Sequence, residues 1–158
     1  MLEKLLLAVD DSEHARKTLP AVVELARAGG GSVHVLHVRE VHYPVRPTVV
    51  GDTPEAAQQL VESFVNELEQ AEVKAEGSVH PSTGGSPAAA ILERARELGT
   101  GLIVVGSHGR SSLGGLLLGS VAHKIIQLSA CPVLVVRDQQ SVEARHHEVL
   151  RAQTRFQA

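Results

Sequence analysis

Aromatic side chains are nearly absent from this chain. Its 158 residues include two Phe, one Tyr and no Trp. The core must therefore be aliphatic, built from Leu, Val, Ile and Ala. The same scarcity argues against recognition of single-stranded nucleic acid, which depends on bases stacked on aromatic rings.

Cysteine and an excess of either charge are also lacking. Cys131 is the only cysteine, which excludes an internal disulfide and any metal site built from several cysteines. Fifteen Lys and Arg face 18 Asp and Glu, for a formal net charge of −3 without a basic block. The net charge and its distribution along the sequence therefore do not indicate a nucleic-acid or membrane partner.

The N-terminus lacks a long apolar run. Its sequence, MLEKLLLAVDD, has apolar residues only over 5–9 before two aspartates follow. That run is too short for the apolar core of a signal peptide or for a membrane span. We therefore expect a cytoplasmic protein, and the length fits one domain with a real core.

Strand and helix signals alternate along the chain. Apolar runs predict buried strands, and a half-polar run predicts an edge strand; the runs are 5–9, 33–38, 73–80 (the half-polar one), 102–105 and 133–136. Helix-start signals separate the strands, at Ser12, Thr53-Pro54 and Ser86-Pro87. Pro20 predicts a kink or a second start in the first helix, and residues 39–53 read as a loop.

This alternation predicts an α/β domain with an open parallel five-stranded sheet and helices on both faces. The half-polar strand belongs at an edge and the most apolar strands in the centre, which gives the order 3-2-1-4-5. The order reverses between the first and fourth strands, where ligands bind outside the carboxyl ends. Those strands end at Asp10 and Gly106.

A glycine-rich segment, GSHGRSSLGGLLLGS, directly follows the fourth strand. It is not a Walker A loop, because Ser120 and Val121 follow its last glycine, and it is not the dinucleotide fingerprint, which follows the first strand. Closely spaced glycines let backbone N–H groups face an anion, and a helix N-terminus adds partial positive charge. Arg110, Ser111, Ser112 and Ser120 would add donors, so the segment suits a triphosphate. The alternative is that the glycines only permit helix–strand packing.

Several motifs together resemble the universal stress protein family over residues 2–138: the glycine block, VDDS, LHV, GGSP and CPVLVVR. The G-x2-G-x9-G-S spacing is similar to that of the ATP-binding branch. The resemblance implies an adenine nucleotide alpha hydrolase-like fold and a cytoplasmic homodimer paired through Val133–Val136. It also implies binding of ATP, with Mg²⁺, in a regulatory stress-response role.

The resemblance also implies a nucleotide site, residue by residue. The cofactor-binding set is Asp10, Val38, Gly106, Gly109, Arg110, Gly119 and Ser120. Asp10 would bond the ribose or the adenine edge, or hold a metal ion with the phosphates, and the backbone of Val38 would meet adenine. The first two glycines would approach the ribose and phosphates, while Gly119 and Ser120 would hold the outer phosphates.

Two features depart from the family pattern. Asp11 stands where many relatives have glycine, which adds negative charge beside a polyanion. Residues 139–158 extend past the domain of residues 1–138, and we expect this extension to be helical or partly disordered.

Phosphorylation of Ser111 or Ser112 would place negative charge where phosphate is expected, and it would therefore oppose phosphate binding.

Two other functions stay open. A slow ATPase or phosphotransferase would need a base or a water-orienting group, and the sequence offers only Asp10, Asp11 and His108. We expect no catalytic residue and, at most, weak ATP hydrolysis. A protein-interaction module independent of nucleotide is the other alternative.

Overall fold

The computed structural model describes residues 2–40, 53–82, 86–108 and 118–137. Its elements in chain order are β1 (Lys4–Val9), α1 (Glu13–Arg16), α2 (Leu19–Gly29), β2 (Ser32–Glu40), α3 (Pro54–Gln70), β3 (Ala75–Ser82), α4 (Pro87–Leu98), β4 (Leu102–Gly106), α5 (Ser120–Leu128) and β5 (Val133–Val136). The second helix start at Pro20 is confirmed, because α2 begins with Pro20 in its first turn. The predicted extension over 139–158 lies outside the described residues.

The five strands form one parallel sheet in the order β3-β2-β1-β4-β5. This is the predicted order. Leu5, Leu6 and Leu7 of β1 have no exposed surface, because helices cover both faces of the central strand. A strand buried on both faces reads as a continuous apolar run, and this is why β1 was recognisable.

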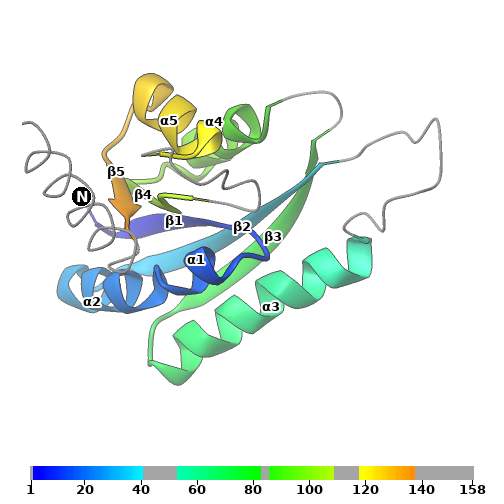
Figure 1. The fold of residues 1–158 in the computed structure, drawn as a ribbon. Coiled ribbons are helices and arrows are strands. Elements are labelled where there is room, and N and C mark those ends of the chain that lie inside the picture. The colour runs from blue at the N-terminus through cyan, green and yellow to red at the C-terminus, as the bar shows by residue number, and fades with distance from the viewer. Residues whose placement is uncertain (1, 41–52, 83–85, 109–117, 138–158) are drawn as a thin grey trace, which may run out of the picture.

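Helices cover the two faces of the sheet unequally. Figure 1 shows α1, α2 and α3 on one side and α4 and α5 on the other. Alternate residues of β1 divide between the two cores, with Leu5 and Leu7 beside α2 and α3 and Leu6 beside α4 and α5. In the part of the chain that the structure describes, no helix is long and apolar enough to cross a membrane.

Strands β2 and β3 are longer at their carboxyl ends than the sequence predicts. The pairing of β1 with β2 ends at Val9 with His37. The pairing of β2 with β3 continues to Glu40 with Ser82. The predicted loop from residue 39 was therefore wrong at its start, and β2 and β3 project together past the end of β1.

The side chain of Arg16 on α1 makes polar and ring contacts with α3. The guanidinium of Arg16 donates to Glu67 and, at 2.9 Å, to Ser63 Oγ. It also lies over the ring of Phe64, 4.7 Å from the ring centroid. Phe64 is fully buried, so Arg16 closes the core over one end of α3 while keeping its charge in water.

The two edges of the sheet differ in character. Strand β3 exposes Glu76, Gly77 and His80, and it lies at an edge as predicted. Strand β5, at the other edge, consists of four aliphatic residues, each half-buried. The polar edge is suited to water, and the described residues cover the aliphatic edge only in part.

Candidate functional site

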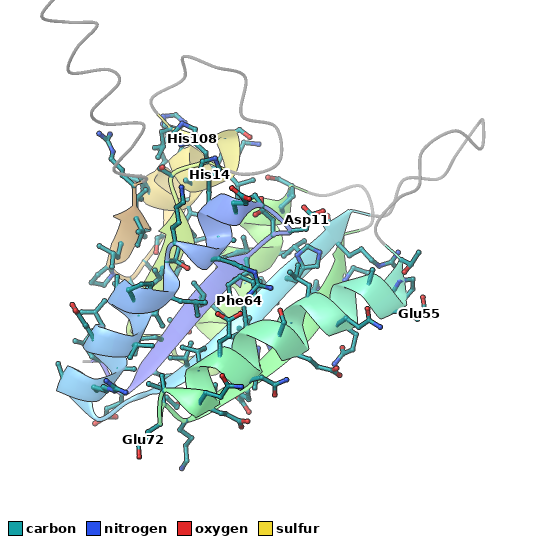
Figure 2. All side chains as sticks on the ribbon, turned by 60° about the horizontal axis from the view of Figure 1, so that its bottom comes forward. Asp11, His14, Glu55, Phe64, Glu72 and His108 are labelled. Atoms are coloured by element: carbon teal, nitrogen blue, oxygen red, sulfur yellow. The ribbon has the colours of Figure 1, made fainter. Side chains whose placement is uncertain are left out.

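The carboxyl end of β4 touches the start of α1 where the strand order reverses. A Cβ on Gly106 would lie 3.3 Å from the carbonyl oxygen of His108 and 3.5 Å from that of His14. The His14 and His108 rings have centroids 5.8 Å apart and are tilted by 48°. Figure 2 shows both rings at the same end of the molecule as Asp11. A side chain at position 106 would therefore meet the backbone carbonyls of His108 and His14.

Asp10 organises the turn from β1 into α1. Its Oδ1 accepts the backbone N–H of Ser12 at 3.1 Å and the Ser12 hydroxyl at 2.5 Å. Ser12 Oγ in turn accepts the N–H of Ala15 at 3.3 Å, as the expected N-cap of α1. These bonds fix a half-buried carboxylate just past the carboxyl end of β1, while Asp11 beside it is exposed.

Gly119 begins α5 and ties it to β4. Its N–H donates to the carbonyl of Ser107 at 2.7 Å, and the N–H of Ser107 donates to the carbonyl of Val136 at 2.9 Å. Gly119 is the N-cap of α5 and makes no side-chain cap bond. At α3, by contrast, the Thr53 hydroxyl accepts the N–H of Ala56 at 3.1 Å. The first turn of α5 therefore receives no side-chain cap from Gly119, and such a helix start favours an anion.

Val38 lies on β2, just past the point where its pairing with β1 ends. It is one residue past the last pair that β2 makes with β1, while its pairing with β3 continues opposite His80. Its side chain is 9% exposed and packs into the core beneath α4 and α5. The backbone of Val38, rather than its side chain, is thus the part that can face a ligand.

A family model describes the evolutionary relationship of the chain. The model for the universal stress protein family matches residues 1–137. The chain belongs to this family. Universal stress protein YxiE of Bacillus subtilis is 39% identical over 149 residues, which cover 87% of this chain and all of YxiE.

Solved structures agree with this family fold. The structure of protein MJ0577 of Methanocaldococcus jannaschii superposes with a TM-score of 0.72 at 28% identity, covering 88% of this chain and 98% of that one. A universal stress protein from Archaeoglobus fulgidus, solved in complex with dAMP, gives a TM-score of 0.62 at 24% identity, covering 85% and 98%. At this identity, the likeness to the A. fulgidus protein shows the fold alone.

In this universal stress protein fold, two predicted site residues, Gly109 and Arg110, lie outside the described residues. Ser111 and Ser112 lie outside them too. Ser120 is exposed at the first position of α5. Among the residues that the structure describes, no group of three or more His, Cys, Asp and Glu is arranged to hold a metal ion.

Two residues near the site were missed by the sequence analysis. Ser107 is buried, and its hydroxyl shares a hydrogen bond of 2.9 Å with His108 Nδ1. His37 is also buried, and its Nδ1–H donates to the carbonyl of Val9 at 2.8 Å, which joins the ends of β1 and β2. The signal for His37 was a histidine inside an apolar run, which indicates a specific buried partner.

Proposed function

We propose that this universal stress protein domain binds ATP in the crevice between the carboxyl ends of β1 and β4, and acts as a nucleotide-dependent regulator. One observation carries the proposal. Three chain segments converge at the strand-order reversal, because the end of β4 lies beside α1 and the N–H of Gly119 donates to the carbonyl of Ser107. Ligands of open α/β sheets bind at this position.

Each part of the nucleotide has a candidate partner. The phosphates would lie at the start of α5, where the backbone of Gly119 and the exposed Ser120 supply donors. Adenine would meet the backbone of Val38, and Asp10 would contact the ribose. Gly109 and Arg110, which lie outside the described residues, would contact the phosphates as the sequence predicts.

Magnesium would enter with the nucleotide. Mg²⁺ is usually held by one or two carboxylates together with substrate phosphates. Asp10, fixed by its bonds from Ser12, is the carboxylate proposed for this role. The A. fulgidus protein, which shares the fold, was solved with dAMP, and this supports the choice of an adenylate.

The test is to purify the chain without added nucleotide, identify any small molecule that denaturation releases, and then titrate ATP by calorimetry. We expect a bound adenylate or measurable heat. At a hundredfold excess over the dissociation constant, binding should stabilise the fold by about 2.7 kcal/mol. A chain that is empty, releases no heat and melts at the same temperature with ATP would overturn the proposal and favour an interaction module.

A charge substitution locates the site. Ser120→Asp places a carboxylate at the start of α5, where it stabilises the helix but repels phosphate. We expect at least a tenfold weaker ATP affinity without loss of stability, since 1.4 kcal/mol corresponds to tenfold. Thr53→Asp is the matched control, because it adds the same charge at the start of α3. Equal effects of the two variants would contradict the assignment.

The proposed regulator is a homodimer paired through β5. Four half-buried aliphatic residues on an edge strand form a surface that a second copy can cover. Sedimentation of the full chain should give twice the monomer mass of 16.8 kDa. A monomer at all concentrations would contradict this part of the proposal alone.

A further inference from the structure

A polar cluster lies on β2 and β3, apart from the residues of the proposed nucleotide site. His34 pairs in register with Glu76, and Ser78 follows two residues later on the same face of β3. His34 Nδ1 lies 3.1 Å from Glu76 Oε1, and His34 Nε2 lies 2.8 Å from Ser78 Oγ. The imidazole is therefore bonded at both nitrogens, by a carboxyl on one side and a hydroxyl on the other.

The charge of Glu76 fixes where the protons lie. The hydrogen bond from His34, and the nearby charges of His34, Lys4 and Arg94, hold the pKa of the Glu76 carboxyl below its ordinary value of 4.5. A carboxylate only accepts hydrogen bonds, so the proton between the two groups is on His34 Nδ1. In the neutral ring Nε2 then carries the lone pair, and the Ser78 hydroxyl donates to it.

We propose that Ser78 is an activated nucleophile, with His34 as its general base and Glu76 as the group that orients the base. A nucleophile within hydrogen-bond reach of a base, itself oriented by a third group, is the arrangement that activates serine. The electrophiles it would take are activated esters and related acyl or phosphonyl compounds. This chemistry is independent of nucleotide binding.

The cluster is open to such a reagent on one side. The Glu76 side chain is 69% exposed, and Ser78 is half-buried. Within the described sheet, β3 has β2 as its sole neighbour, so alternate N–H groups of β3 point outward from the edge. An outward N–H group within reach of Ser78 Oγ would be a donor for a developing oxyanion, and the positive charges of Lys4 and Arg94 lower the pKa of the neighbouring Glu76.

The step is a substitution at an acyl carbon. The Ser78 Oγ–C bond forms and the ester C–O bond breaks. The hydroxyl proton moves to His34 Nε2 and then to the leaving oxygen. Water then attacks the acyl-serine with the same base, which releases the acid and restores Ser78. With a fluorophosphonate, the Oγ–P bond forms, the P–F bond breaks, and fluoride leaves with the proton.

The test uses a fluorophosphonate probe on the folded full chain, with the labelled residue found by mass spectrometry of proteolytic fragments. We expect one label, on Ser78, which is absent from urea-unfolded protein and from Ser78→Ala. His34→Gln should slow labelling by about 100-fold or more, the usual contribution of a positioned base. Glu76→Gln, at an exposed side chain, should slow it less.

The matched control is Ser63→Ala. Ser63 is a half-buried serine of α3 that donates to the carbonyl of Leu60 and accepts from Arg16, so its loss should leave labelling unchanged. Circular dichroism and melting temperature show whether each variant is folded. Two results would overturn the proposal: no label on Ser78 of the folded wild type, or an unchanged rate in folded Glu76→Gln and His34→Gln.

Discussion

Replacing Gly77 by alanine should force α3 and β3 apart. A Cβ at this position would lie 2.2 Å from Val61 Cγ1 and 3.1 Å from Val65 Cγ2. Carbon atoms pack at about 3.5–4.0 Å, so a movement of more than an ångström is needed. Val61 is 1% exposed and has no open space to turn into.

The magnitude follows from these contacts. Overpacking of a filled core costs about 1–3 kcal/mol, and replacing a glycine in a strand returns about 0.5–1 kcal/mol of that. We therefore expect Gly77→Ala to lower the free energy of unfolding by about 1 kcal/mol. Val61→Ala alone should cost about 2 kcal/mol, through lost burial and a cavity.

The double variant decides whether the reasoning is right. With Val61 shortened, the new methyl group enters the space that the valine leaves. The double variant should then cost less than the sum of the single variants by at least 1 kcal/mol, although the contact with Val65 keeps the rescue incomplete. Urea unfolding followed by circular dichroism measures all four proteins. Additivity within about 0.5 kcal/mol would refute the steric account.

Three further predictions concern caps and charges. Thr53→Ala should cost about 1 kcal/mol, and Ser86→Ala less, because the Ser86 side chain makes no cap bond; equal midpoints in urea would contradict this. Arg16→Met should lower the free energy of unfolding by about 1 kcal/mol, because it removes the exposed ion pair and the cation–π contact with Phe64. The loss should be smaller in 1 M salt, and a loss that does not change with salt would show that the ion pair contributes nothing. Glu76→Gln should lower stability at pH above 4.5. That difference in stability should shrink as the pH falls through the depressed folded-state pKa, because the carboxylate then takes up its proton. A difference that grows in acid would contradict the inference that the ionised Glu76 stabilises the fold.

The order of the strands was predictable because burial leaves a strong pattern in sequence. The uninterrupted apolar runs of β1 and β4 required cover on both faces, and the polar β3 required an edge. The ends of β2 and β3 were not predictable in the same way. Arg39 and Ser82 lie in strands because each strand supplies the other's hydrogen bonds, and a single sequence does not show that pairing.

For the residues of the candidate site, the sequence predicted their places in the fold better than their contacts. Asp10, Gly106 and Gly119 follow from the strand order and the glycine spacing. The bonds of Ser107 to Gly119 and Val136 depend on loop closure, which the sequence does not specify. The contacts of His34 with Glu76 and Ser78 span 42 and 44 residues. These contacts depend on the register of β2 against β3, which the sequence does not specify. The bounds of β3, Ala75–Ser82, are also shifted by two residues from the expected strand over 73–80.

The unlike edges of the sheet limit how large an assembly can grow. A sheet with two aliphatic edges could add copies at both ends, and such head-to-tail growth leads to filaments. Here one edge of the described sheet carries Glu76 and His80, and the opposite edge, β5, is aliphatic. Two copies that meet through β5 use the same surface on each partner, so the contact is closed by symmetry. In the proposed dimer the outer edges of the two sheets are then both the polar β3, which offers no aliphatic strand for further edge-to-edge pairing.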